Sequence, residues 1–455
     1  MKVIVIGGGP IGVEAALYAA RLGLDVQLFE RGALCDNVRA WRHIGLFTEW
    51  KRNRSPLSTK ILTQNGALLP DAETTSTGEQ LADYVAQIAS LEKLRGRIHA
   101  QTEVVAITRE RTLKSDFYEK PERVQQLFRL LVRDKNGERT EHADVVIDAT
   151  GVYATPNPMG NGGIWAVGER ELASRIDYAL PDVSGRDRAR FTHRHTLIIG
   201  SGHSAASTLR SVAELFGDTT CDANPFNSEL YDATSSTRSS TQITWVVRRD
   251  MPSHGFPYTI DANDQSPHRE ALHRRANELS RQPNVDFRAR TVVEKVAWRN
   301  EKFVVTLSTQ NGDKIQYSMI ECDNIACHAG FRADTKLWRE LQIVEHPATG
   351  GPFGLGTSIL ETNCRAGVGL STGYAEKTPT SSTRTTSDEI PIDNLGDVKN
   401  NATLICVGEP IFYVVGIKSY GRDAGFLMQN GFRQVRDVFK IVMQSDVDLY
   451  DGALN

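Results

Sequence analysis

The sequence has few cysteines and no cysteine motif. Six cysteines occur among 455 residues, and no two of them are spaced as Cys-x-x-Cys. A secreted disulfide framework and a zinc-finger site both require closely spaced cysteines. His193 and His195 form an isolated His-x-His pair, and no third ligand is visible beside them. We therefore expect free thiols and no metal site.

Long hydrophobic runs and an excess of one charge are also missing. No apolar run approaches the ~18 residues of a membrane-spanning helix, and the apolar start at 3–6 is too short for a signal peptide. The net charge is −3, so there is no basic surplus that would bind nucleic acid or anionic lipid. We expect a cytoplasmic protein that binds neither nucleic acid nor membrane. The oligomeric state stays open.

The strongest motif lies in the first thirty residues. The β-branched run Lys2–Ile6 precedes a glycine-rich turn at 7–12, and a helical composition follows. In a dinucleotide site, the first glycine permits a tight turn, the second lets the pyrophosphate approach the backbone, and the third lets helix and strand pack closely. The pattern therefore predicts a dinucleotide site. Its predicted contact residues are Gly7, Gly9, Pro10 and Gly12.

A carboxylate follows at the spacing expected for a ribose ligand. The second apolar strand, Asp25–Phe29, is followed by Glu30, which lies 18 residues past Gly12. In a dinucleotide-binding domain, the acid that accepts hydrogen bonds from the adenosine ribose stands about 20 residues further on. Glu30 is therefore expected to accept hydrogen bonds from an adenosine ribose.

A second copy of the motif begins near residue 195. The strand His195–Ile199 precedes a second glycine turn, alanine stands at the third glycine position, and a helix is expected over 206–215. This copy predicts a second dinucleotide site. Its predicted contact residues are Gly200, Gly202, His203, Ser204 and Ala205.

The two copies belong to a longer repeat. Each is followed by a hairpin with an Asn-Gly turn, at 136–137 and at 311–312, and then by a closing apolar strand that ends in glycine. We therefore expect an α/β fold with two Rossmann-like domains, each a doubly wound parallel sheet with a β-meander. One domain is nested in the other, with boundaries at 1–180, 181–335 and 336–455.

These residues resemble the flavoproteins with two dinucleotide-binding domains, which include flavin-containing monooxygenases and disulfide reductases. Members of this superfamily hold FAD in the first domain and NAD(P)H in the second. Both of their domains close with a strand ending in an Ala-Thr-Gly-like turn, which the sequence matches at 148–151. The resemblance implies an NADPH-binding domain, 181–335, inserted in an FAD-binding domain, 1–180 and 336–455.

The resemblance also implies further FAD contacts. In the superfamily, a strand ending in Gly-Asp returns to the FAD domain and its acid binds the ribityl chain of the flavin; here the run 403–407 is followed by Gly408 and Glu409. The loop at 35–50 is rich in Trp and Arg and would face the isoalloxazine ring; an ordinary surface helix is the alternative. The implied contacts are Arg31, Arg39, Trp41, Val104, Thr150, Gly151, Gly408 and Glu409.

The second site differs from the first in the residues after its second strand, which would select the cofactor. The strand at 243–247 is followed by Arg248 and Arg249 instead of an acid. A carboxylate would repel a 2′-phosphate, whereas a guanidinium matches its geometry. Arg248 and Arg249 therefore favour NADPH. A polar insertion at 217–240 lengthens the preceding connection.

The cysteines and the second glycine motif indicate the branch of the superfamily. A disulfide reductase needs a redox cysteine pair near the flavin, whereas only Cys35 follows Glu30, beside Asp36. The Gly-x-Gly-x-Ser-Ala form of 200–205 resembles the flavin-containing monooxygenases, although the chain is a divergent relative because the signature that they carry ahead of it is not matched. We expect an FAD-dependent, NADPH-using monooxygenase. It would form a flavin C4a-hydroperoxide and oxygenate a small organic substrate with O₂, by N- or S-oxygenation or hydroxylation. The alternative is an NADPH-dependent flavin reductase that passes electrons to a quinone, ferredoxin or disulfide partner.

The segment 411–424 carries the candidate catalytic residues. It lies between Glu409 and a C-terminal helix expected at about 425–443, whose N-terminus would point at the flavin by the geometry of the superfamily. The polar stretch 371–401 is expected to be a surface loop and a candidate lid. The candidate catalytic residues are Lys418, Tyr420 and Arg422.

Overall fold

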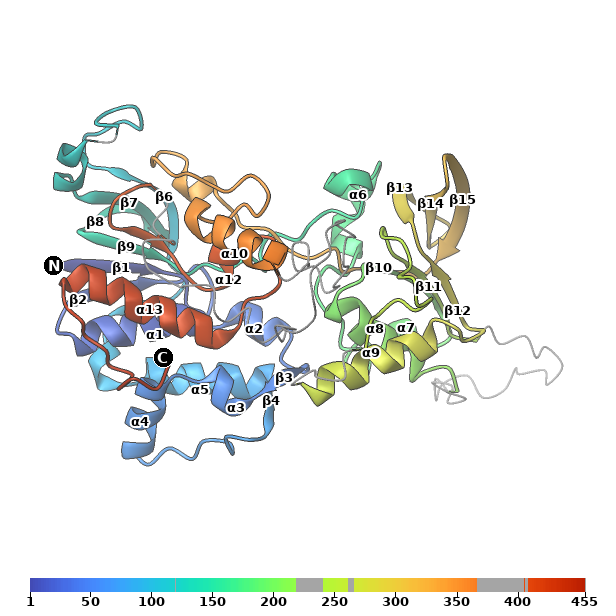
Figure 1. Cartoon of the computed structure of the whole chain (residues 1–455), viewed down its shortest axis with the longest axis horizontal. Helices are drawn as coiled ribbons and strands as arrows, with labels where there is room; N and C mark the ends of the chain where they lie inside the picture. The colour runs from blue at the N-terminus through green and yellow to red at the C-terminus, as the bar shows by residue number, and fades with distance from the viewer. Residues whose placement is uncertain (119, 218–239, 261–265, 366–404, 406–407, 455) are drawn as a thin grey trace, which may run out of the picture. The chain divides into compact units, whose positions relative to one another are not determined.

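The computed structural model describes residues 1–118, 120–217, 240–260, 266–365, 405 and 408–454 (Figure 1). It divides into two compact units: Met1–Pro156 together with Phe331–Asn455, here called unit 1, and Asn157–Gly330, here called unit 2. Two parallel sheets with Rossmann-like connections confirm the expected α/β class. The 217–240 insertion lies almost wholly, and the 371–401 loop entirely, outside the described residues.

The first unit boundary lies at Pro156, whereas the sequence placed it at 180. The segment in question pairs with strands of unit 2, because Gly160 bridges Val293 and Asp177 bridges Ala326. Asp177 also donates its backbone N–H to the Ile325 carbonyl, at 2.9 Å. These long-range hydrogen bonds, which leave no local sequence signal, assign 157–180 to unit 2.

Unit 1 contains a five-stranded parallel sheet. The strand order β17-β9-β1-β2-β5 places β1 at the centre, where both faces are buried. Its β-branched sequence suits that position, because β-branched side chains pack well on a pleated surface with both faces covered. The strands are β1 (Lys2–Ile6), β2 (Asp25–Phe29), β5 (Ile98–His99), β9 (Val145–Asp148) and β17 (Phe412–Val414).

Helices cover one face of this sheet. In Figure 1, α1 and α13 run side by side across it, although their sequences are more than four hundred residues apart. Tyr18 of α1 stacks on Phe439 of α13 with ring centroids 5.2 Å apart, which joins the two helices. The helices of the unit are α1 (Pro10–Arg21), α2 (Asp36–Ala40), α3 (Trp50–Asn53), α4 (Pro56–Gln64), α5 (Gly78–Ala89), α10 (Phe353–Arg365), α12 (Ile417–Tyr420) and α13 (Met428–Met443).

An antiparallel meander packs on the other face. Its hairpin turns at Asn136-Gly137 as predicted, and Phe128 packs between this meander and the sheet, 6.1 Å from the ring of Phe412. Leu130, Val132 and Trp338 belong to the same buried cluster. The meander strands are β6 (Glu103–Arg109), β7 (Phe128–Asp134) and β8 (Gly137–Ala143); a separate two-stranded sheet joins β3 (Gly45–Glu49) and β4 (Thr75–Thr77).

Unit 2 repeats this architecture with a smaller sheet. The parallel order β12-β11-β10-β16 centres on β11 and β10, and a meander with the second predicted Asn-Gly turn, at Asn311-Gly312, packs against it. None of the helices among the described residues of the whole chain is long and apolar enough to span a bilayer. The elements are α6 (Glu169–Leu172), α7 (Arg188–Phe191), β10 (His195–Ile199), α8 (His203–Ala213), β11 (Gln242–Val246), α9 (Pro267–Leu279), β12 (Val285–Arg288), β13 (Thr291–Arg299), β14 (Lys302–Asn311), β15 (Lys314–Cys322) and β16 (Asn324–Cys327).

Candidate nucleotide-binding sites

The first glycine turn joins β1 to α1. Gly7 has φ +106°, and a Cβ atom there would lie 2.5 Å from the carbonyl oxygen of Ala149, so no side chain fits. A Cβ at Gly12 would lie 2.0 Å from the Gly7 oxygen. A Cβ at Gly9 would meet no atom within 4 Å. Gly7 and Gly12 are therefore required by the fold itself, whereas Gly9 faces open space that a ligand can use.

The N-terminus of α1 is suited to an anion. Gly9 is its N-cap and Pro10 its first residue; the cap receives no side-chain hydrogen bond, and the first turn holds no acid. The N–H groups of the first turn of a helix have no intrahelical partner and favour negative charge. This open cradle fits the pyrophosphate of FAD.

Glu30 lies against the same turn, directly after β2. Its Oε2 atom accepts a hydrogen bond from the Gly8 N–H at 2.6 Å, and Oε1 accepts one from the Gly32 N–H at 2.8 Å. A carboxylate has about four lone-pair sites, so two remain for ribose hydroxyls. The ribose contact stays a prediction that this geometry allows.

The loop after Glu30 contains buried polar atoms without partners. Trp41 Nε1 and His43 Nε2 are both buried and have no hydrogen-bond partner among the described residues. Such atoms are costly unless a ligand or water satisfies them, which fits the predicted position of this loop beside the flavin. Arg39 instead pairs with Glu79 at 3.3 Å, and Arg31 is exposed.

Lys418 forms a buried ion pair with the closing strand. Its Nζ atom donates to Asp148 Oδ2 at 2.8 Å and to Thr150 Oγ1 at 2.9 Å, and the two charged side chains are 1% and 0% exposed. Trp338 Nε1 donates to the same Asp148 oxygen, at 2.6 Å. Lys418 therefore holds the turn that contains Thr150 and Gly151 in place. Two of the three donors of its ammonium are used in these contacts, so the structure gives Lys418 an anchoring role, and its catalytic role stays a prediction.

The other two catalytic candidates occupy different environments. The Tyr420 hydroxyl accepts a hydrogen bond from Asn430 Nδ2 at 2.9 Å and is 2% exposed, so it ties α12 to α13, and its catalytic role likewise stays a prediction. Arg422 is exposed, and its backbone N–H donates to the Thr349 carbonyl. A contact of Arg422 with substrate or flavin stays a prediction.

Glu409 is held by two arginines. Its carboxylate is fully buried and accepts hydrogen bonds from Arg109 Nε at 2.8 Å and from Arg123 Nη2 at 2.9 Å. The Gln342 N–H donates to it as well, at 2.8 Å. Burial acts to raise the pKa of Glu409, but the hydrogen bonds from Arg123 and Arg109 outweigh it and lower the pKa. This carboxylate is a structural anchor for the loop before β7 and the segment at 342; its predicted contact with the ribityl chain has no support in this geometry and stays a prediction.

The returning strand ends eight residues later than predicted. Among the described residues, β17 pairs with β9, with Phe412 opposite Val146 and Val414 opposite Asp148. It leads to Gly416, which has φ +72° and donates its N–H to Gln434 Oε1 at 2.8 Å. Gly416, not Gly408, therefore ends the strand beside β9, and Ile417 follows where the superfamily has an acid. Of the predicted run 403–407, only residue 405 is described.

Val104 belongs to the meander. It is half-buried in β6, opposite Val132, and packs against the apolar cluster that contains Ile107. Its predicted contact with FAD has no support in this packing and stays a prediction.

The second glycine turn has the same backbone geometry as the first. Gly200 has φ +120°, and a Cβ there would lie 2.3 Å from the His328 carbonyl oxygen. Gly202 is the N-cap of α8, without a side-chain hydrogen bond, and a Cβ there would meet nothing within 4 Å. Ala205 is buried at the third position. His203 and Ser204, both half-buried, form the first turn of α8, where the predicted phosphate would bind.

Two buried aromatic residues hold this second turn. Trp245 Nε1 donates to the Gly200 carbonyl at 2.8 Å, and the Tyr258 hydroxyl donates to the Gly202 carbonyl at 3.2 Å. A column of stacked rings continues from Tyr258 to His273, 4.5 Å away, and on to His203. Trp245, Tyr258 and His273 were not predicted from the sequence as part of the site. The only signal was a tryptophan inside an apolar strand, and that also occurs in ordinary cores.

Arginine side chains gather at the carboxyl end of β11. Arg248 is exposed and Arg249 is half-buried, as a nucleotide ligand at this edge would require. Asp250 follows, and its carboxylate is ion-paired with the guanidinium of Arg290, which comes from the end of β12. The sequence did not suggest Arg290, because only the pairing of β11 with β12 brings it there.

The described cysteine thiols are buried. Cys35, Cys322 and Cys327 are free, and burial raises the pKa of each to about 12. Such thiols are poor nucleophiles, because the thiolate is the reactive form. No group of three His, Cys, Asp or Glu side chains suited to a metal ion occurs among the described residues.

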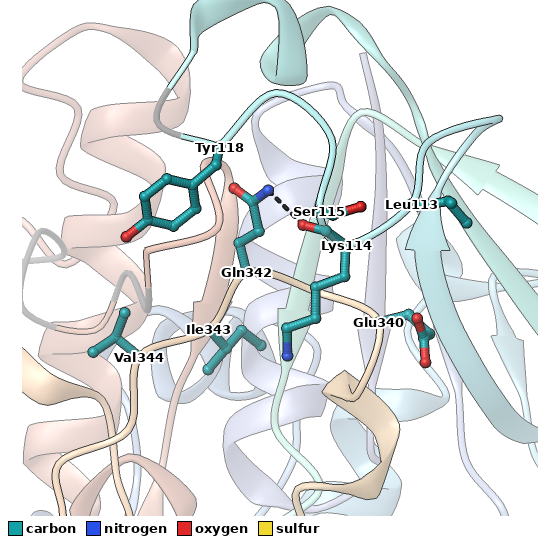
Figure 2. Close-up of a pocket in the computed structure, with 8 residues that line it drawn as sticks. All are labelled: Leu113, Lys114, Ser115, Tyr118, Glu340, Gln342, Ile343 and Val344. Atoms are coloured by element: carbon teal, nitrogen blue, oxygen red, sulfur yellow. Dashed lines mark hydrogen bonds between the residues drawn. The ribbon is translucent and has the colours of Figure 1, made fainter.

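Unit 1 has a surface pocket with a volume of about 590 Å³, which Figure 2 shows between the 113–118 loop and the 340–344 segment. Gln342 lies in its wall and donates to the Lys114 carbonyl at 2.7 Å. No residue of either glycine turn lines this pocket.

Comparison with known proteins places this geometry in a family. A family model described as pyridine nucleotide-disulphide oxidoreductase matches residues 1–351. No curated protein matches the chain in sequence.

Several solved structures share the fold over nearly the whole chain. Bacillithiol disulfide reductase Bdr (YpdA) from Bacillus cereus is 14% identical, with 97% of this chain and 99% of that chain covered and a TM-score of 0.62. The cadaverine monooxygenase DfoA from Erwinia amylovora is 12% identical, with 98% and 94% covered and a TM-score of 0.57. Thioredoxin reductase from Lactococcus lactis is 16% identical, with 97% and 99% covered and a TM-score of 0.53. At such identities the likeness shows the fold alone.

Proposed function

The chain belongs to the pyridine nucleotide-disulphide oxidoreductase family, and we propose that it is an NADPH-using monooxygenase of small organic substrates. The family agrees with the two cofactors expected from the sequence, FAD and NADPH. Similar structures include both a monooxygenase and disulfide reductases, so the fold does not choose the reaction. The choice depends on the residues of this chain.

Unit 1 would hold FAD. The N–H groups at the start of α1 would bind the pyrophosphate beside Gly9, where a Cβ atom would meet nothing within 4 Å. Glu30, anchored by Gly8 and Gly32, would accept the ribose hydroxyls. Trp41 Nε1 and His43 Nε2, which are buried and unpartnered among the described residues, would supply donors to the flavin.

Unit 2 would hold NADPH in the same manner. The start of α8 and Gly202 offer the pyrophosphate site, and Trp245 and Tyr258 keep the turn in shape by donating to its carbonyl oxygens. Arg248 and Arg249 provide the positive charge that a 2′-phosphate needs. When bound, the two cofactors would supply the redox chemistry, with NADPH reducing FAD and the reduced flavin activating O₂.

The observation that carries the monooxygenase over a disulfide reductase is the state of the thiols. A disulfide reductase passes electrons through reactive cysteines, whereas Cys35, the described thiol closest in sequence to the FAD-binding turn, is 4% exposed, and burial raises its pKa to about 12. Its Sγ atom lies 3.7 Å from the Gly8 carbonyl oxygen. It therefore packs beneath the turn instead of facing a substrate. O₂, in contrast, needs no protein thiol.

The reaction of the reduced enzyme with O₂ tests the proposal. The purified holoenzyme is reduced anaerobically with NADPH and mixed with O₂, and the flavin spectrum is followed by stopped flow. We expect the oxidised spectrum to return in two resolved phases, with NADP⁺ retained until the second. Single-phase return with one hydrogen peroxide formed per NADPH would contradict a monooxygenase and favour electron transfer to a quinone, ferredoxin or disulfide.

Thiol alkylation is the matched control. Iodoacetamide should leave the rate of NADPH oxidation with O₂ unchanged, because the proposed reaction with O₂ needs no protein thiol and Cys35, Cys322 and Cys327 are protonated and buried. Inactivation together with loss of reduction of a small disulfide would instead indicate a reductase.

A further inference from the structure

We propose that Arg290 is a third ligand of the 2′-phosphate of NADPH, and that Asp250 holds its guanidinium in place until the phosphate displaces the carboxylate. This inference rests on the proposed NADPH site of unit 2. It adds a residue from a different strand and an exchange of ion pairs on binding.

Backbone pairing places Arg290 beside the two arginines at the end of β11. The Arg290 N–H donates to the Arg249 carbonyl at 2.9 Å, and the Thr291 N–H donates to the Val247 carbonyl at 3.0 Å. The two chain segments that leave β11 and β12 therefore run side by side at the carboxyl edge of the parallel sheet. Ligands of such sheets bind outside this edge. These backbone hydrogen bonds thus place Arg290 at the edge of the sheet where ligands bind.

The backbone at Arg290 is in the left-handed region, with φ +49°. Residues with a Cβ atom adopt this region at a cost, and glycine or asparagine would adopt it more easily. Gln101 of the corresponding turn in unit 1 has φ +55°, and its N–H donates to the Gly32 carbonyl as that of Arg290 donates to the Arg249 carbonyl. This conformation therefore belongs to the repeated turn, and it fixes the point from which the Arg290 side chain leaves the backbone.

The charges at this edge suit a phosphate monoester. Arg248, Arg249 and Arg290 bring three positive charges, and Asp250 brings one negative charge. A phosphate monoester carries about −1.5 to −2 near pH 7. Arg290 therefore adds to the positive charge that Arg248 and Arg249 supply.

The Arg290–Asp250 pair is open to exchange. The two side chains are 44% and 54% exposed, so solvent weakens their attraction. Asp250 Oδ1 accepts a hydrogen bond from the Met251 N–H at 2.8 Å, so the carboxylate is fixed by its own turn. A doubly charged phosphate that forms two parallel hydrogen bonds with the guanidinium is a stronger partner than this exposed carboxylate. Arg290 can therefore turn to the phosphate while Asp250 stays in place.

Arg290→Gln tests the assignment, and Arg288→Gln is the matched control. Arg288 stands two residues away with the same charge, but it pairs with Asp286 and donates to Ser318 Oγ at 3.0 Å. The dissociation constants of NADP⁺, NAD⁺, 2′-AMP and 5′-AMP for the holoenzyme are measured by calorimetry, after FAD content and melting temperature have confirmed the fold. Arg290→Gln should weaken NADP⁺ and 2′-AMP about tenfold and leave NAD⁺ and 5′-AMP unchanged. Arg288→Gln should change none of them.

Asp250→Asn gives the opposite result if the exchange occurs. Removing the competing carboxylate should tighten NADP⁺ and 2′-AMP about threefold or more and leave NAD⁺ unchanged. Weaker NADP⁺ binding by this variant would overturn the exchange.

Failure of this inference differs from failure of the proposed cofactor. A wild-type enzyme that prefers NADP⁺, together with an Arg290→Gln variant that binds NADP⁺ as the wild type does, overturns the role of Arg290 alone. Equal losses of NADP⁺ affinity in Arg290→Gln and Arg288→Gln overturn it too, because they indicate that NADP⁺ responds to the overall positive charge of this edge and not to a contact with Arg290. A wild-type enzyme that binds NAD⁺ as tightly as NADP⁺ overturns the NADPH assignment and this inference together.

Discussion

The two glycine turns share a backbone and differ in nearly everything that surrounds it. In unit 1 the carbonyl oxygen of Ala149, just after the closing strand, lies against Gly7. In unit 2 the carbonyl oxygen of His328 lies against Gly200 in the same way. Gly9 and Gly202 both face open space. The repeat therefore preserves the features that admit a pyrophosphate.

The side chains around the turns follow different plans. Asp148 stands opposite Ile6 in the first sheet, whereas Cys327 stands opposite Ile199 in the second. The first position carries a buried charge that Lys418 neutralises, and the second carries a neutral thiol. The first turn is held by a buried ion pair on its closing strand, and the second by hydrogen bonds from two buried aromatic side chains. The same glycine turn can thus be stabilised in two ways. The residue after the second strand of each sheet also differs, Glu30 in unit 1 and Arg248 in unit 2, so the two turns have different expected ligands.

The largest expected effect is the loss of one cofactor when a single glycine in either turn is replaced. Gly9→Val should abolish FAD binding, because the side chain fills the space for the pyrophosphate while meeting no protein atom at Cβ. Gly202→Val should abolish NADPH binding and leave FAD in place. Released flavin is identified by chromatography, and apo wild type serves as the stability control for Gly9→Val. FMN in the wild type, or FAD retained by Gly9→Val, would break the comparison.

The buried charge of unit 1 is the next test. Lys418→Met should lower the free energy of unfolding by about 3–5 kcal/mol, because Asp148 would be left buried without its partner. Adding Asp148→Asn to this variant should recover part of the loss, since neither charge then remains. The midpoint of urea unfolding, followed by FAD release, measures both. If Lys418→Met were as stable as the wild type, the buried charge on the closing strand of unit 1 would contribute nothing that the thiol on the closing strand of unit 2 lacks.

Buried Glu14 of α1 gives unit 1 a pH dependence at a position where α8 of unit 2 carries Ser207. Glu14 is 1% exposed, and burial raises its pKa to about 7. The folded state then holds a proton that the unfolded state releases above about pH 4.5. The contribution of Glu14 to stability should therefore fall by roughly 3 kcal/mol as the pH rises from about 4.5 to 7, opposite in sign to that of buried His328 in unit 2, whose pKa is lowered to about 4. The difference in melting temperature between the wild type and Glu14→Gln should change with pH over this range, and a constant difference would contradict the assignment.

The smallest expected effect concerns the strand end of unit 2. Arg248→Ala should weaken NADPH binding by one to two orders of magnitude, since charge-assisted hydrogen bonds to phosphate contribute roughly 1.5–3 kcal/mol. NADH affinity should hardly change. Because Arg249 can share the contact, the double variant decides: if it still prefers NADPH over NADH, the strand end does not select the cofactor. Fluorescence titration with both nucleotides measures the ratio.

Local sequence patterns were enough to predict the strands and turns that occur in both units. The run Lys2–Ile6, the glycine turns and the two Asn-Gly hairpins all lie where the sequence predicted them, because each depends on residues close together in the chain. Glu30 was found from spacing alone, since the helix between the two strands has a nearly fixed length.

The errors come from contacts between distant residues. Two apolar runs end in glycine eight residues apart, at Gly408 and Gly416, and the acid after Gly408 favoured the wrong one. Only Arg109 and Arg123, about 300 residues earlier, show that Glu409 is a structural acid. Lys418 was predicted to be catalytic, whereas the structure shows it in a buried ion pair. Its partner Asp148 lies 270 residues away, so its role as an anchor was invisible.

The position of β17 also sets the order in which the chain can complete itself during synthesis. Unit 2 is continuous over 157–330, whereas the sheet of unit 1 lacks its edge strand until residue 414 has been made. At ~5–20 residues per second, the ribosome needs about 13 to 50 s to travel from the first boundary to that point. Throughout this interval β9 presents an unpaired edge, and α1 lacks its cover from α13. An unpaired edge of this kind is open to pairing with another chain until β17 covers it.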